Sequence, residues 1–340
     1  MSINEANEEA IALLATDNGS SSLPSVLNPT SDQASPNSSS SEGSVSQNLT
    51  VPWETFIRDA NDQEIKSRFA QEIKEISARH SESLEKYCVL AFLEPCDGID
   101  QFDLDALFRA LCNLDLDQNK DILLILLSRG GSIEPAYQIS KLCRLFAKDK
   151  FVVCVPRLAK SAATLIALGA DEIHMGILGQ LGPIDPQLVG DLPALGVAQA
   201  LQTMASLVEK FPGSAEMFAS YLHKAIKIVQ IGYCDRISES AIQYAERLLA
   251  TKPNLAEKAA LIARHLVQAY KDHSFVIDLE EAQNCLGSDW VKTGTGEVQF
   301  AEEIYARFDY VNRILYQFRK PMRLIVIADF DTGTWLLGDQ

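Results

Sequence analysis

Three short, almost wholly apolar runs constrain the fold of this chain more than any other feature of its sequence. These runs are residues 87–93, 121–127 and 151–155, and segments with helical periodicity at 104–112 and 134–147 separate them. Strands that are apolar throughout lie in a sheet covered on both faces, and the intervening helices indicate right-handed βαβ connections. The pattern therefore predicts an α/β fold built on a parallel sheet.

The segments on either side of these runs differ in composition. Residues 1–50 hold thirteen serines and six acidic residues but no lysine or arginine, which predicts a disordered acidic tail. Residues 51–86 place apolar side chains at helical spacing among many charges, so we expect an amphipathic helix there. We expect the main domain over residues 87–295, and a C-terminal extension with a helix and a strand over residues 296–340.

Charge and cysteine usage disfavour several classes of function. The chain has 30 Lys and Arg against 46 Asp and Glu, a net charge of -16, which argues against nucleic-acid and anionic-membrane partners. Its seven cysteines form no C-x-x-C pair, so we expect the reducing cytoplasm and no zinc site built from cysteines. The longest aliphatic run, residues 122–127, is far shorter than the roughly 20 residues of a membrane span. We expect no membrane span, no metal and no cofactor.

Two consecutive glycines, Gly130 and Gly131, follow the most apolar run and precede a helical segment. Paired glycines allow positive φ angles and let backbone N–H groups approach a ligand that a side chain would block. Because ligands bind at the carboxyl ends of parallel strands, these amides are candidates for holding an oxyanion. The alternative is a plain strand-to-helix turn. The sequence has neither a phosphate-binding nor a dinucleotide-binding glycine motif.

Ser161 stands at a second junction of this kind, where the run 151–155 has ended and a helix of small residues begins. A serine at the beginning of a helix usually caps it, because its hydroxyl accepts a hydrogen bond from an unpaired amide. The small residues after Ser161 permit another role, in which the hydroxyl faces a cleft and the Ala162 amide points into the same space. The pairing of the two junctions favours a nucleophile.

Three stretches of the sequence carry a family resemblance: LSRGGSI at 127–133, AKSAATLIALGADEI at 159–173 and LGPIDPQ at 181–187. They resemble the serine dehydrogenase proteinase family, which has the ClpP/crotonase fold and is related to signal peptide peptidase A. The resemblance implies a parallel-sheet core of ββα units with a helical C-terminal extension. It also implies a serine peptidase that cleaves peptide bonds through an acyl-enzyme on Ser161, in a catalytic domain over residues 87–295.

The same resemblance assigns further roles. It implies that Gly130, Gly131 and Ala162 form the oxyanion hole and that residues 181–187 border the substrate groove. The expected substrate is a peptide or a protein. Proteins of this fold associate through helical extensions, so a homo-oligomer is implied, with the helical residues 197–250 as candidate contacts.

The general base is harder to assign from sequence. In Clp proteases the base is a histidine that follows the nucleophile, but the corresponding neighbourhood here reads Ile184-Asp185-Pro186-Gln187. Relatives of signal peptide peptidase A use a lysine further along the chain, which corresponds to Lys210, with Lys224 and Lys227 as alternatives. A lysine can act as a base only when desolvation lowers its pKa towards neutrality.

Other titratable residues are weaker candidates. His273 is a second possible base, although its distance from Ser161 cannot be inferred from sequence. Asp185 could orient a base or bind a substrate amine, but Asp-Pro more often marks a turn. His174 is expected to be a buried structural histidine. Lys160 is expected to point away from Ser161, because it lies next to it at the beginning of a helix.

Two alternatives to an active peptidase remain open at this point. The first is a catalytically inactive subunit of the same fold that binds peptides or serves in assembly, which the absent histidine would explain. The second is an acyl-thioester enzyme of the crotonase branch, which would use the same glycine pair without a serine nucleophile. The acidic composition disfavours this second alternative, because coenzyme A calls for a basic surface.

Overall fold

The computed structural model describes residues 51–113, 120–188, 192–225, 228–318, 323–329 and 336–338. All of these residues belong to one unit of the chain, Val45–Gln340. The predicted acidic tail, residues 1–50, lies outside the described residues. Within the described ranges no helix is both long enough and apolar enough to cross a membrane.

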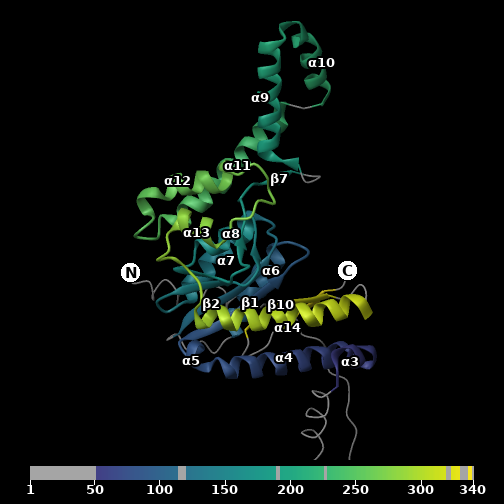
Figure 1. The fold of residues 1–340 in the computed structure, drawn as a ribbon, viewed down its shortest axis with the longest axis vertical. Coiled ribbons are helices and arrows are strands. Elements are labelled where there is room, and N and C mark those ends of the chain that lie inside the picture. The colour runs from purple at the N-terminus through teal and green to yellow at the C-terminus, as the bar shows by residue number, and fades with distance from the viewer. Residues whose placement is uncertain are drawn as a thin grey trace, which may run out of the picture. The chain divides into compact units, whose positions relative to one another are not determined.

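A sheet that is parallel over most of its width forms the centre of this unit (Figure 1). Across the sheet the strands are β11 (Leu336–Gly338), β10 (Arg323–Asp329), β1 (Tyr87–Glu94), β2 (Asp121–Ser128), β3 (Phe151–Val155), β5 (Glu172–Met175) and β9 (Val291–Lys292). The strands from β1 to β9 pair in parallel, whereas β10 pairs antiparallel with β1 and with β11. The predicted parallel α/β core is confirmed, with an antiparallel edge added to it.

Two short strands extend the sheet beyond the carboxyl end of β2. They are β4 (Leu158–Ala159), which pairs with β2 through Ser128 and Ala159, and β6 (Gln180–Leu181), which pairs with β4. A separate two-stranded sheet joins β7 (Gln187–Leu188) and β8 (Leu192–Pro193). The short strands matter for function because β4 leads directly into the turn that carries Ser161.

The continuous apolar character of β2 follows from its place in the middle of the sheet. Successive side chains of a strand point to opposite faces. Leu124 and Leu126 belong to the hydrophobic cluster on one face, and Leu123 and Ile125 belong to the cluster on the other. All four side chains are fully buried. A strand with two covered faces has no position for a polar side chain, which is why its sequence does not alternate.

Helices cover both faces of the sheet. Helices that contribute to the first cluster are α6 (Gln101–Asn113), α7 (Ile133–Phe146), α8 (Ala162–Leu168), α11 (Ile228–Leu249), α12 (Ala259–Arg264) and α13 (Leu279–Leu286). Helices on the opposite face are α3 (Trp53–Asp59), α4 (Asp62–Arg79), α5 (Ser81–Leu84) and α14 (Gly296–Phe318). The short π-helix η3 (His265–Ala269) also contributes to the first cluster, through Leu266 and Val267. The remaining helices are α9 (Ala194–Lys210), η1 (Pro212–Ser214), α10 (Ala215–Ala225) and η2 (Ala256–Lys258).

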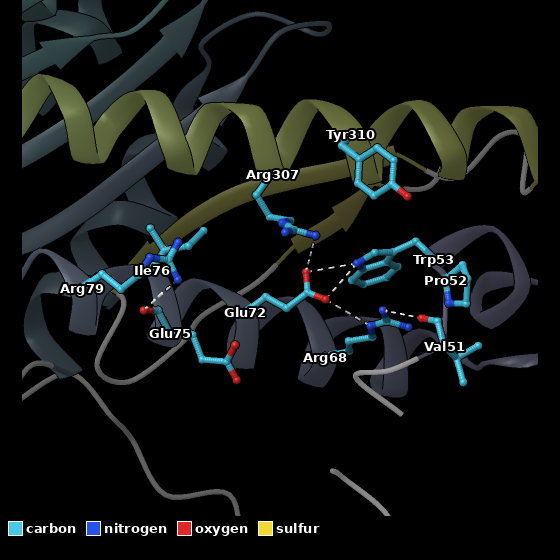
Figure 2. A pocket seen from close by; sticks show the side chains of 10 residues that line it. All are labelled: Val51, Pro52, Trp53, Arg68, Glu72, Glu75, Ile76, Arg79, Arg307 and Tyr310. Carbon is cyan, nitrogen blue, oxygen red and sulfur yellow. Dashed lines mark hydrogen bonds and ion pairs between the residues drawn. The ribbon is translucent and has the colours of Figure 1, made fainter. Parts of the chain in front are cut away.

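A buried polar network joins α3, α4 and α14 on the face opposite α8 (Figure 2). The indole N–H of Trp53 lies 3.0 Å from each carboxylate oxygen of Glu72. Arg68 and Arg307 reach the same carboxylate, at 3.2 Å and 3.1 Å. These side chains and Tyr310 border a cavity of about 380 Å³. None of the residues predicted to be catalytic lines this cavity.

Candidate active site

Ser161 occupies a sharp turn between β4 and α8. Its φ of 51° and ψ of -118° make it the one non-glycine residue with positive φ in the part of the chain that the structure describes. A non-glycine residue in such a conformation costs of order 1–3 kcal/mol, and such turns expose the nucleophile in serine hydrolases. The Ser161 hydroxyl makes no capping hydrogen bond to α8, and the residue is 9% exposed. The backbone of Ser161 thus has the geometry of a nucleophile turn, and its hydroxyl does not serve as a cap.

Gly130 packs directly against this turn. A Cβ atom at position 130 would lie 2.7 Å from Cβ of Ser161 and 2.9 Å from the carbonyl oxygen of Lys160, and the φ of Gly130 is 115°. The close approach of neighbouring atoms and the positive φ each require glycine at position 130. The Gly130 N–H donates to Oγ of Ser128 at 3.1 Å, and its carbonyl accepts from the Ile99 N–H at 2.7 Å. The two junctions singled out in the sequence therefore meet in the structure.

Gly131 is held at the same place by the loop that follows β1. Its φ is 143°, and a Cβ atom there would lie 2.1 Å from the backbone nitrogen of Ile99. Gly131 is exposed, whereas Gly130 is buried. Among the described residues, the N–H groups of Gly131 and Ala162 have no hydrogen-bond partner. These two amides are available to an oxyanion bound beside Ser161.

Residues 181–185 form a segment that is hydrogen-bonded to the Ser161 turn. Oγ1 of Thr164, in α8, lies 2.8 Å from the carbonyl oxygens of both Ala159 and Gly182 and accepts the Gly182 N–H at 3.1 Å. Leu181 forms an antiparallel bridge with Ile277, with N–H to O distances of 2.8 Å and 3.1 Å. Thr164 thus links residues 181–185 to the Ser161 turn by hydrogen bonds. The same residues pair with the segment that precedes α13.

This arrangement brings Asp185 and His273 together. Nδ1 of His273 lies 3.9 Å from Oδ2 of Asp185, which is 7% exposed. The Nδ1 atom is buried and has no hydrogen-bond partner in the described residues. In a Ser-His-Asp set the carboxylate faces Nδ1, which leaves Nε2 for the serine. Both residues are weaker candidates from sequence alone, because they come close through long-range pairing such as the bridge between Leu181 and Ile277.

The lysines predicted as bases lie on other elements. Lys210 ends α9 and Lys224 lies in α10, and both are exposed to solvent. Lys227 lies outside the described residues. A lysine base depends on burial, which neither of the two described lysines has.

The side chains of His174 and Lys160 both form hydrogen bonds with residues other than Ser161. His174 is 3% exposed, with its ring nitrogens 2.8 Å from Oγ1 of Thr295 and 3.1 Å from a carboxylate oxygen of Glu172. The buried position predicted for His174 is confirmed, and burial lowers its pKa. The ammonium group of Lys160 donates to the backbone carbonyls of Ser274 and Phe275, in the segment that follows His273.

Comparison with known proteins identifies relatives of this chain. The family of ClpP-like SDH-type serine proteinases matches residues 97–312. Two uncharacterized proteins of Methanocaldococcus jannaschii, MJ0137 and MJ1495, are 32% identical over 188 residues and 29% identical over 164 residues. These matches cover 55% and 48% of this chain, and 59% and 50% of the two relatives. The chain thus spans between half and two thirds of the length of the curated relatives it matches.

Two solved structures illustrate the similarity in the course of the chain. A mutant of the membrane-bound stomatin-specific protease 1510-N aligns with a TM-score of 0.40 and 18% identity, over 61% of this chain and 78% of that chain. ClpP1 from Listeria monocytogenes aligns with a TM-score of 0.37 and 14% identity, over 64% of this chain and 98% of that chain.

Proposed function

Because the chain belongs to the family of ClpP-like SDH-type serine proteinases, we propose that it cleaves peptide bonds through an acyl-enzyme on Ser161. The observation that carries this proposal is the turn at Ser161, whose positive φ and uncapped hydroxyl distinguish it from an ordinary helix start. Gly130 packs against the same turn without a side chain that could block it. The substrate of such an enzyme is a peptide or a protein.

In the proposed reaction the hydroxyl oxygen of Ser161 attacks the carbonyl carbon of the scissile bond. Negative charge then develops on the carbonyl oxygen, where the N–H groups of Gly131 and Ala162 donate to it. Gly130 contributes space, since its own N–H donates to Ser128. The tetrahedral intermediate collapses by breaking the C–N bond, which leaves the acyl group on Ser161. A water molecule then attacks the acyl carbon and releases the second product.

We assign the general base to His273, oriented by Asp185. The imidazole takes the proton from the Ser161 hydroxyl through Nε2 and gives it to the leaving amine, while the carboxylate at Nδ1 stabilises the imidazolium. The support for this assignment is the contact between Nδ1 of His273 and the buried Asp185 carboxylate. Along the chain the three residues occur in the order serine, aspartate, histidine.

Lys210 and Lys224 are the competing assignment for the base. Their exposure to solvent argues against them, because a solvated lysine stays protonated at neutral pH. Substitution decides between the two assignments. His273→Gln should slow the labelling of Ser161 by covalent probes to a small residual rate that can still be measured, whereas Lys210→Met and Lys224→Met should leave the rate unchanged.

The helices around α9 and α10 support a proposal that the chain forms a homo-oligomer. Large apolar side chains are exposed there, with exposed fractions of 64% for Phe211, 62% for Met217, 61% for Tyr221 and 57% for Tyr233. Exposed apolar surface of this kind marks protein contacts. Light scattering at micromolar concentration tests the proposal, and a monomeric mass would contradict it.

The seven cysteines are free, which supports the cytoplasm as the compartment.

Intact mass after exposure to a fluorophosphonate, and separately to a β-lactone, tests the assignment of Ser161. Both probes modify an activated serine hydroxyl covalently. We expect one adduct on the wild type and none on Ser161→Ala. Ser132→Ala is the matched control, because Ser132 also precedes a helix and also makes no capping hydrogen bond. If folded wild-type protein gives no adduct with either probe, the inactive peptide-binding alternative is favoured.

A further inference from the structure

Lys160 links the turn that carries Ser161 to the segment that carries His273. Its Nζ donates hydrogen bonds to the carbonyl oxygens of Ser274 and Phe275, at 3.2 Å and 2.9 Å. Its own backbone N–H donates to the carbonyl of Ser128 at 3.0 Å, which ties the residue to the end of β2. One end of Lys160 is thus anchored in the sheet and the other end holds the residues directly after His273.

The surroundings of Lys160 fit its side chain closely. A Cβ atom at Gly182 would lie 2.5 Å from Cδ of Lys160, so the glycine leaves the room that the aliphatic stem occupies. Burial, together with the charge of Arg129, lowers the pKa of Lys160 from its usual value. A lysine with a partly desolvated ammonium group that donates to two carbonyls differs from a solvated surface lysine.

Besides Lys160, Asp272 restrains the beginning of the segment that follows His273: its carboxylate accepts from the N–H and the hydroxyl of Ser274, and its carbonyl oxygen accepts from the N–H of Phe275. The side chains of Ser274, Phe275 and Val276 are exposed. The Phe275 ring packs on Tyr270 with centroids 4.7 Å apart, and Ile277 forms the bridge to Leu181. Hydrogen bonds from a charged donor are stronger than those between neutral groups, so the Lys160 ammonium is a major restraint between these two points.

We propose that Lys160 is a positioning residue that holds the carbonyl groups of Ser274 and Phe275, and thereby keeps the His273 imidazole in reach of the Ser161 hydroxyl. The inference rests on the proposed function, since it needs Ser161 as nucleophile and His273 as base. Lys160 itself takes no proton from Ser161, because its ammonium group is directed at the two carbonyls.

The test is a double-mutant cycle on the rate of fluorophosphonate labelling in the full chain. Wild type, Lys160→Met, His273→Gln and the double variant are labelled at several probe concentrations, which separates the maximal rate from the half-saturating concentration. Lys271→Met is the matched control, an exposed lysine in the same segment. Thermal unfolding of each variant shows that it is folded.

We expect Lys160→Met to lower the maximal labelling rate about 10- to 100-fold with an unchanged half-saturating concentration, because a displaced base slows the chemical step. In the His273→Gln background the same change should have no further effect, because Lys160 acts through His273. A wild-type rate for Lys160→Met overturns the proposal, and so does an equal slowing in both backgrounds. If Lys160→Met does not fold, Lys160→Gln takes its place in the cycle.

Different results would contradict the proposed function and the proposed role of Lys160. Undiminished labelling of Ser161→Ala removes the proposed function, and undiminished labelling of His273→Gln removes the assignment of the base. If Ser161→Ala is not labelled and His273→Gln is labelled slowly while Lys160→Met keeps the wild-type rate, the proposed function stands and the role of Lys160 alone is wrong.

Discussion

Ser132 and Ser161 occupy equivalent positions, each immediately before a helix at the carboxyl end of the sheet, yet their backbones differ completely. Ser132 has extended angles, φ -73° and ψ 132°, whereas Ser161 has φ 51° and ψ -118°. Neither hydroxyl caps the helix that follows it. Residue type and place in the fold therefore do not separate a candidate nucleophile from an ordinary serine. The backbone conformation does.

The surroundings explain why the turn at Ser161 can hold this conformation. A strained backbone persists only when neighbouring contacts determine it from several directions. The Thr164 hydroxyl donates to the carbonyl of Ala159, and the N–H of Lys160 donates to the carbonyl of Ser128, so two hydrogen bonds hold the residues that lead into the turn. Gly130 presses on the turn from the neighbouring junction. Ser132 has an unstrained backbone and needs no such enclosure.

The largest effect is expected from removing the hydroxyl of Ser161. Ser161→Ala should lower the rate of peptide hydrolysis about ten-thousandfold or more, since loss of a nucleophile removes the acyl-enzyme route. Ser132→Ala should retain the wild-type rate. Steady-state hydrolysis of a fluorogenic peptide that the wild type cleaves measures both. Equal activity of Ser161→Ala and wild type would contradict the assignment of Ser161, and not Ser132, as the nucleophile.

The second effect tests the enclosure of the turn. Gly130→Ala places a Cβ atom 2.7 Å from Cβ of Ser161 at a φ of 115°, so we expect a loss of about 3 kcal/mol in the free energy of unfolding. Labelling of Ser161 should fall as well. Gly213→Ala is the control, because a Cβ atom there meets nothing within 4 Å. Urea unfolding compares the variants, and a neutral Gly130→Ala would contradict the close packing described above.

The third effect is expected at the beginning of α6, next to the loop that packs against Gly131, the residue before Ser132. Burial, with nearby carboxylates, raises the pKa of Asp103 from 3.8 to about 6. The folded state therefore favours the neutral carboxyl group, and its stabilising contribution, present below pH 3.8, is lost as the pH rises through 6. Asp103→Asn should gain on the order of 1–3 kcal/mol relative to wild type between pH 4 and pH 7. Urea unfolding at several pH values measures this difference, and a pH-independent difference would contradict it.

The smallest effect is expected at Ser132. Ser132→Ala should change the free energy of unfolding by less than about 0.5 kcal/mol, because no capping bond is lost. Asn61→Ala is the contrasting case, since Asn61 and Glu64 form a capping box at α4 whose loss costs about 1 kcal/mol. Thermal unfolding of the two variants provides the measurement, and a larger loss for Ser132→Ala would reverse the expected order.

The sequence predicts those parts of the fold and the candidate site whose signals are local. β2 could be recognised because both of its faces are buried, and the approach of Gly130 to Ser161 was anticipated because both end neighbouring parallel strands. The segment 51–86 was expected to hold one amphipathic helix. It is instead divided, because Asn61 begins a new helix with a capping box.

Long-range pairings could not be predicted in this way. The contact of Asp185 with His273 depends on the bridge between Leu181 and Ile277, and neither residue carries a pattern that identifies the other. The sequence predicts a strand within residues 296–340, but nothing in the composition of that segment indicates that the strand pairs with β1. Such contacts depend on where a crossover returns the chain to the sheet, which local periodicity does not specify.

The antiparallel pairing of β10 with β1 has a consequence for how the chain matures on the ribosome. β1 is among the first strands to be synthesised, and its partner on one side, residues 323–329, is synthesised after every other strand that β1 or β2 contacts. Until then one edge of β1 presents unpaired backbone groups and its apolar side chains lack part of their cover. Such an edge can pair with other chains. The nascent protein therefore passes through a stage in which protection from aggregation depends on residues that have not yet been made.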